Sequence, residues 1–150
     1  TATLFEAGTR LAGVISQADD ATEQALARFG MDLGIAFQIV DDALDYTGKD
    51  IGKNVGDDLE EGKPTLPLIR AIQTAAPEQA SLVRDAIEQG GRDRIDEIMQ
   101  IIRETDAIDY SMNLARQYAE AASRQLETLP ASSYRDALAE LAHFSVNRDY

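Results

Sequence analysis

Apolar residues recur at helical spacing along almost the whole chain, and no segment shows the strict alternation expected of a half-buried β-strand. The clearest amphipathic segment runs from Ala107 to about Leu126, where apolar residues follow alternating steps of four and three. Pro130 ends this segment, and Ser132 or Ser133 is placed to cap a last helix. The pattern predicts an all-α fold in one domain.

Two helices are predicted in the first third of the chain. The first runs from Thr1 to about Ser16, and the second from Asp20 to about Tyr46. The start of the second helix resembles a capping box, because Glu23 follows Asp20 by three residues. Its second half carries apolar residues on nearly every side, which predicts a helix surrounded by other helices, with its acids projecting into an enclosed cavity.

Prolines and glycines divide the middle of the chain into shorter helices. Pro64 is expected in a helical first turn, with the helix continuing to about Thr74. Pro77 should start the next helix, and the glycine pair at 90–91 should end it. Another helix is predicted around residues 95–102.

Composition excludes several classes of function. The chain has 27 acidic and 14 basic residues and a net charge of −13, which argues against a nucleic-acid partner. No apolar run is long enough for a transmembrane segment and no signal-peptide pattern is seen, so a soluble protein is expected. The absence of cysteine excludes disulfides and thiolate sites, and the single histidine, His143, excludes a multi-histidine metal site.

Three acids, Asp41, Asp42 and Asp45, lie within one turn at the end of the second predicted helix. Like charges repel at this spacing, and a helix C-terminus is itself unfavourable for anions. Mg²⁺ takes oxygen ligands and is typically held by one or two carboxylates together with substrate phosphates. The cluster therefore predicts a magnesium site, and the alternative is a solvated helix face.

Two lysines follow the acids in segments that are predicted to turn tightly at their glycines, Gly48, Gly52, Gly56 and Gly62. Lys53 and Lys63 are suited to a diphosphate that also carries metal ions, because lysine binds phosphate as a point charge. The alternative is that both are ordinary surface lysines. Two interpretations of Asp57 and Asp58 stay open: they are loop or capping residues, or they are ligands.

Three motifs in this order form a compound signature: Phe-Gln-x-x-Asp-Asp-x-x-Asp from Phe37, Gly-Lys-Asn-x-Gly-Asp-Asp from Gly52, and Gly-Lys-Pro-Thr from Gly62. With them, the chain resembles the C-terminal half of trans-type polyprenyl diphosphate synthases, closest to bacterial long-chain members such as octaprenyl diphosphate synthases. The resemblance implies a helical bundle around a central cavity, a homodimer and a cytoplasmic location. It also implies head-to-tail condensation of isopentenyl diphosphate onto an allylic diphosphate, with farnesyl diphosphate expected and Mg²⁺, or Mn²⁺ in its place, as cofactor.

The resemblance also implies roles for individual residues. The metal-binding group is the aspartate-rich motif Asp41, Asp42 and Asp45. The group that contacts the allylic diphosphate consists of Thr1, Gln38, Lys53 and Lys63. The two lysines are the implied catalytic residues, because they stabilise the charge that develops on the leaving diphosphate.

The chain also departs from the family pattern. The family has two aspartate-rich motifs, and this chain contains one, so residues 1–150 are expected to be the C-terminal portion of a single prenyltransferase domain whose N-terminal half is absent. Alone, the chain is expected to be inactive. The alternatives are a related class I terpenoid enzyme, either a short-chain synthase or a cyclase, and a non-catalytic partner subunit.

Overall fold

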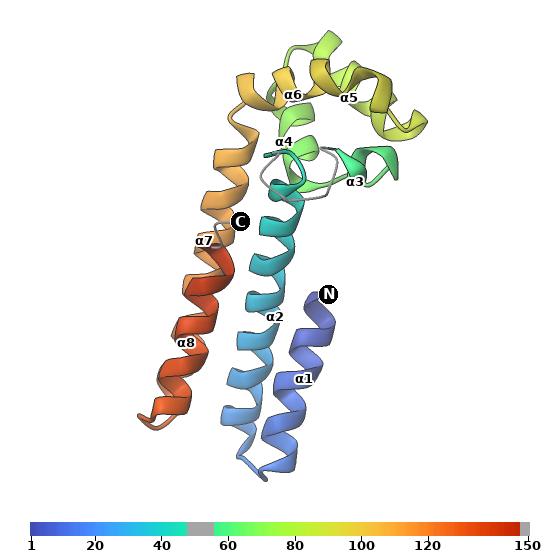
Figure 1. The fold of residues 1–150 in the computed structure, drawn as a ribbon. Coiled ribbons are helices and arrows are strands. Elements are labelled where there is room, and N and C mark those ends of the chain that lie inside the picture. The colour runs from blue at the N-terminus through green and yellow to red at the C-terminus, as the bar shows by residue number, and fades with distance from the viewer. Residues whose placement is uncertain (48–55, 148–150) are drawn as a thin grey trace. The chain divides into compact units, whose positions relative to one another are not determined.

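The computed structural model describes residues 1–47 and 56–147, and every regular element in these residues is a helix (Figure 1). The all-α prediction is therefore confirmed for the described part of the chain. The chain divides into two compact units. Within the described residues the first comprises 1–38 and 114–147, and the second comprises 39–47 and 56–113.

Helices from both ends of the chain build the first unit. They are α1 (Ala2–Ile15), most of α2 (Asp20–Leu44), the later part of α7 (Ala107–Gln125), the 3₁₀ helix η2 (Leu126–Thr128) and α8 (Ser133–Val146). The buried core of this unit is formed by Phe29, Leu33, Ala122, Leu126 and Ala142. Since these residues come from α2, α7, η2 and α8, the unit depends on contacts between segments far apart in the sequence.

Two glycines of α2 allow α1 to approach closely. A Cβ atom on Gly30 would lie 2.5 Å from the carbonyl oxygen of Phe5 and would also meet the Thr9 hydroxyl. A Cβ atom on Gly34 would lie 2.6 Å from the Cα of Ala2. Both positions therefore require glycine for the observed packing of α1 on α2.

The second unit is built from the end of α2 and from shorter helices. These are α3 (Asp57–Glu60), α4 (Leu66–Thr74), α5 (Pro77–Gln89), the 3₁₀ helix η1 (Arg92–Arg94), α6 (Ile95–Glu104) and the start of α7. Helix α4 packs against α5 and α6, and α3 packs against α5. The largest buried side chains of its core are Tyr46, Leu59, Leu68, Val83, Ile98 and Ile102.

Two predicted helix boundaries are confirmed by their cap geometry. Gly90 follows α5 in the left-handed conformation, with φ 72°, which ends the helix at the predicted glycine pair. Ser132 precedes α8, and its side chain accepts a hydrogen bond from the backbone N–H of Arg135 at 3.2 Å. Of the two serines considered, Ser132 is therefore the cap.

Two residues predicted to act at helix starts are displaced. Helix α2 begins at Asp20 as predicted, but the side chain that caps it is that of Asp19, whose Oδ1 accepts from the Thr22 backbone N–H at 2.8 Å, so the capping box predicted from Asp20 is one residue too late. The proline in the first turn of α4 is Pro67, and Pro64 lies before the helix. In each case two chemically suitable residues stand close together, and local pattern does not choose between them.

The second predicted helix is also shorter than expected. Helix α2 ends at Leu44, and Asp45 and Tyr46 lie in the turn that follows. The four-residue helix α3 was not predicted, because it is too short to show a helical period. In the described residues no helix combines the length and the apolar character that crossing a membrane requires.

The close approach of α1 and α2 can be tested with two glycine substitutions. We expect Gly30→Ala to lower the free energy of unfolding by about 1–3 kcal/mol, because the new methyl group meets backbone atoms that cannot move away. Gly8→Ala is the control, since a Cβ atom there has nothing within 4 Å, and alanine should stabilise this helix by up to about 1 kcal/mol. Urea unfolding of both variants measures the difference, and a Gly30→Ala protein as stable as wild type would contradict the packing described.

Candidate functional site

The three predicted metal-binding acids lie where α2 ends. Asp41 and Asp42 belong to the last turn of α2, and Asp45 follows it, with its backbone N–H bonded to the Asp41 carbonyl at 3.3 Å. Asp41 is exposed to solvent, whereas Asp42 and Asp45 are half-buried. No group of three acidic, histidine or cysteine side chains in the described residues is arranged to hold a metal ion. Their role in metal binding therefore stays a prediction.

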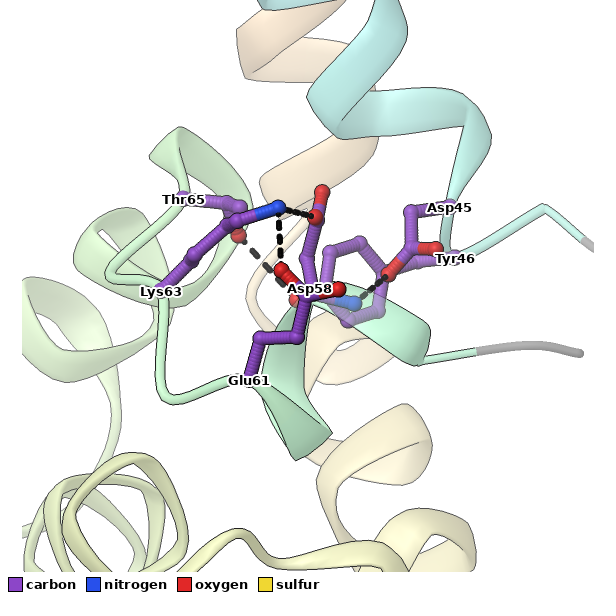
Figure 2. Close-up of polar contacts among 6 residues, drawn as sticks. All are labelled: Asp45, Tyr46, Asp58, Glu61, Lys63 and Thr65. Atoms are coloured by element: carbon purple, nitrogen blue, oxygen red, sulfur yellow. Dashed lines mark hydrogen bonds and ion pairs between the residues drawn. The ribbon is translucent and has the colours of Figure 1, made fainter.

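Asp45 ties the end of α2 to the short helix α3. Its Oδ2 accepts a hydrogen bond from the backbone N–H of Asp58 at 3.1 Å (Figure 2). Asp58 is the second residue of α3, and the first backbone N–H groups of a helix have no partner inside it. The carboxylate of Asp45 therefore satisfies a donor of the segment that carries Lys63.

A buried hydrogen bond makes a second tie between the same segments. The Thr65 hydroxyl donates to the phenol oxygen of Tyr46 at 3.1 Å, and the two residues are 4% and 2% exposed (Figure 2). Burial raises the pKa of Tyr46 well above its ordinary value, so the phenol is neutral at physiological pH. Because Thr65 directly precedes α4, this bond joins the end of α2 to the start of α4.

Lys63 lies between two acids on the loop between α3 and α4. Its Nζ is 2.8 Å from Oδ1 of Asp58 and 2.7 Å from Oε2 of Glu61 (Figure 2). Hydrogen bonds to Asp58 and then to Glu61 raise the pKa of Lys63, which keeps the ammonium charged. The side chain is 55% exposed, and these two partners account for two of its three donors.

Gly62 gives the backbone the turn that places Lys63. It has φ 71°, and a Cβ atom there would lie 2.9 Å from the carbonyl oxygen of Ile87. The backbone N–H of Lys63 returns to the Asp58 carbonyl at 2.9 Å. Gly56, with φ 84°, likewise has a positive φ, so the predicted glycine turns are confirmed at both positions. Gly48 and Gly52 lie outside the described residues.

The remaining predicted residues are distributed differently. Lys53 lies outside the described residues. Thr1 and Gln38 belong to the first unit, whereas the acids and Lys63 belong to the second. Thr1 is exposed at the start of α1, and Gln38 is half-buried on α2. The structure therefore brings together the end of α2 and Lys63, and the predicted roles of Lys53, Thr1 and Gln38 stay predictions.

Comparison with known proteins identifies the family. A profile of the polyprenyl synthetase family matches residues 1–105. The chain belongs to the polyprenyl synthetase family. The octaprenyl diphosphate synthase of Haemophilus influenzae is 49% identical over 153 residues, covering 100% of this chain and 46% of that protein. The octaprenyl diphosphate synthase of Escherichia coli is 43% identical, covering 99% of this chain and 47% of that protein.

Solved structures of polyprenyl synthetases have the same fold. A decaprenyl diphosphate synthase from Rhodobacter capsulatus matches with a TM-score of 0.91 and 37% identity, covering 100% of this chain and 47% of the other. The polyprenyl synthase of Caulobacter crescentus, solved with calcium and isoprenyl diphosphate, matches with a TM-score of 0.87 and 40% identity, covering 98% of this chain and 46% of the other. The resemblance found in the sequence is confirmed, and the chain spans about half the length of these relatives.

The buried bond between Tyr46 and Thr65 predicts a specific pattern of stability. Tyr46→Phe and Thr65→Val should each lower the free energy of unfolding by about 1–3 kcal/mol, since each leaves a buried hydroxyl without its partner. The double variant should cost less than the sum, because no unpaired hydroxyl remains. Urea unfolding of the set measures this, with Tyr134→Phe, at an 83% exposed position, as the neutral control. Strictly additive losses would show that the two hydroxyls do not interact.

Proposed function

We propose that the protein containing this chain condenses isopentenyl diphosphate onto an allylic diphosphate and makes a long-chain polyprenyl diphosphate. Membership of the family and the 49% identity to an octaprenyl diphosphate synthase support this proposal. The structural observation that carries it is the double tie, Asp45 to Asp58 and Tyr46 to Thr65, between the acidic end of α2 and the segment holding Lys63. It holds a candidate metal-binding end and a candidate phosphate-binding cation in one unit.

The acids at the end of α2 fit a magnesium ion by their chemistry. Asp41 and Asp42 supply hard carboxylate oxygens, and Asp41 is exposed. Asp45 adds a third carboxylate, of which Oδ2 accepts from α3. A cage of three side chains is not needed, since Mg²⁺ keeps several waters and takes phosphate oxygens as ligands. Mg²⁺, or Mn²⁺ in its place, would supply positive charge that stabilises the leaving diphosphate.

In this proposal, the side chains that contact the allylic diphosphate are Thr1, Gln38, Lys53 and Lys63. Lys63 supplies a charged ammonium, which donates hydrogen bonds to phosphate oxygens as it does to carboxylates. Gln38 and Thr1 supply amide and hydroxyl donors. The two lysines are the proposed catalytic residues, because negative charge grows on the diphosphate as the reaction proceeds.

The reaction begins when the allylic carbon–oxygen bond breaks and its electron pair leaves with the diphosphate. Fixed lysine ammonium groups stabilise that charge more in the transition state than in the bound substrate, which lowers the barrier. The double bond of isopentenyl diphosphate attacks the allylic carbocation, and loss of a proton forms the new double bond. Farnesyl diphosphate is the proposed starter.

Two relatives support alternative functions for the protein. The geranylgeranyl diphosphate synthase of Saccharolobus solfataricus is 32% identical over 99% of this chain, which supports a short-chain synthase as the second candidate. A cyclase shares the ionisation step but not the elongation. A protein named heptaprenyl diphosphate synthase component 2, from Bacillus subtilis, is 35% identical, which supports a partner subunit as a further alternative. Product length separates a short-chain synthase from a long-chain one, a cyclic product would indicate a cyclase, and a protein that makes no product by itself would indicate a partner subunit.

The proposal includes a homodimer in the cytoplasm, without a nucleic-acid partner. Large apolar side chains are exposed on α1 and α8, and homodimer interfaces are more apolar than the rest of a protein surface. They include Leu4, Leu11, Ile15, Leu141 and Phe144. The net charge of −13 disfavours binding to a phosphate backbone.

A labelled condensation assay tests the proposed reaction. The protein from the complete reading frame, given isopentenyl diphosphate, farnesyl diphosphate and Mg²⁺, should make products longer than geranylgeranyl diphosphate. Asp41→Ala should lower kcat by about 10²–10³-fold, and Asp85→Ala, an exposed acid of α5, should leave it unchanged. Residues 1–150 alone should make no product. Products that stop at geranylgeranyl diphosphate would favour the short-chain alternative, and activity retained in Asp41→Ala would contradict the assigned acid.

Metal removal provides an independent prediction. Chelation with EDTA should abolish condensation by the complete protein, and added Mg²⁺ or Mn²⁺ should restore it, because the leaving diphosphate needs a cation beyond the lysines. Asp42→Asn should raise the Mg²⁺ concentration that gives half-maximal activity several-fold by removing one carboxylate ligand. Condensation that continues at full rate in EDTA would contradict the metal assignment.

A further inference from the structure

Asp58 joins the two halves of the candidate site through different atoms. Its backbone N–H donates to Oδ2 of Asp45 at 3.1 Å, and its side-chain Oδ1 accepts from Nζ of Lys63 at 2.8 Å (Figure 2). One end of this residue therefore contacts a proposed metal-binding acid, and the other contacts a proposed phosphate-binding cation. The proposed function uses the backbone N–H of Asp58 and gives its side chain no role.

The two acidic partners of Lys63 are not equivalent. The Asp58 side chain is 20% exposed, whereas that of Glu61 is 63% exposed. An exposed ion pair is weak, because water screens the charges and two long side chains must be ordered to form it. Asp58 has a short side chain, and its backbone is held by Asp45. Of the two acids, Asp58 is therefore the one that can fix the position of the ammonium.

The local backbone reinforces this difference. Leu59, the next residue of α3, is completely buried, which anchors the helix in the core of the unit. The backbone N–H of Lys63 donates to the Asp58 carbonyl at 2.9 Å, so the main chain of Lys63 is attached to the same residue as its ammonium. Asp58 therefore contacts Lys63 at both ends of the lysine.

We propose that Asp58 is a positioning residue that acts through Lys63. It fixes the ammonium to a helix whose backbone is tied to Asp45, so that the lysine is already placed when a diphosphate binds. Preorganised charge stabilises a developing anion without the cost of reorientation during the reaction. This inference rests on the proposed function for the ligand, and it assigns Asp58 no contact with metal or substrate.

A double-mutant cycle on the complete protein tests the inference. Asp58→Ala should raise the KM for farnesyl diphosphate about tenfold, the loss expected for one charge-assisted hydrogen bond, while the KM for isopentenyl diphosphate changes less than twofold. Asp58→Asn keeps the size, an acceptor oxygen and the backbone N–H, so it should recover part of the loss. Glu61→Gln is the matched control at the other partner of Lys63 and should change neither KM by more than about twofold.

The decisive comparison is made in the absence of the lysine. Lys63→Gln should raise the KM for farnesyl diphosphate at least as much as Asp58→Ala, and adding Asp58→Ala to Lys63→Gln should cause no further loss. Multiplying losses would overturn the inference, and a simultaneous rise in the Mg²⁺ requirement of Asp58→Asn would make Asp58 a metal ligand instead. An effect of Glu61→Gln as large as that of Asp58→Ala would also overturn it.

Binding of inorganic diphosphate separates this inference from the proposed function. Four proteins are titrated calorimetrically with diphosphate and Mg²⁺: wild type, Asp58→Ala, Lys63→Gln and the double variant. Their affinities for diphosphate should show the same non-additive pattern, whether or not condensation occurs. If the four affinities follow this pattern and the wild type makes no polyprenyl product, the proposed reaction fails and the positioning role stands. If product forms but the two substitutions weaken diphosphate binding independently, the positioning role fails and the reaction stands.

Discussion

Repulsion among the acids at the end of α2 is the constraint on which our account of the candidate site depends. Asp41, Asp42 and Asp45 bring like charges to the end of a helix where the backbone carbonyls are already unfavourable for anions. The structure relieves part of this within the chain, because Asp45 accepts an N–H from α3. In our account, Mg²⁺ and the diphosphate relieve the remainder. Because the remaining repulsion is relieved only when Mg²⁺ and diphosphate bind, it increases the affinity of the site for them.

The fold could be predicted largely from the sequence because helical period is a local property. Apolar spacing located α5, α6 and α7, and Gly90 and Ser132 ended or began helices for the conformational and capping reasons expected of them. The errors arose where two suitable residues are close neighbours. Asp19 and Asp20 can both cap a helix, and which one does so depends on the approach of the preceding chain.

The candidate site was predictable only in part. The acids and Lys63 follow from motif and spacing, whereas the contacts that position Lys63 do not. Tyr46 and Thr65 are 19 residues apart, so no local pattern pairs them, and Tyr46 was predicted only as the end of a helix. Asp58 and Lys63 are five residues apart, outside the helical spacing that indicates an ion pair. These contacts depend on a turn at Gly62 and on burial of α3, which are properties of the folded unit.

Coupling between metal and diphosphate binding is the most direct measure of whether the acids of α2 and the lysines act on one ligand. Calorimetric titration of the complete wild-type protein with inorganic diphosphate, with Mg²⁺ and then with EDTA, measures that coupling. The account predicts affinity at least about tenfold higher with Mg²⁺, a gain that disappears when Asp41 and Asp42 are both replaced by alanine. Equal affinity with and without Mg²⁺, or a gain that survives loss of both acids, would contradict it.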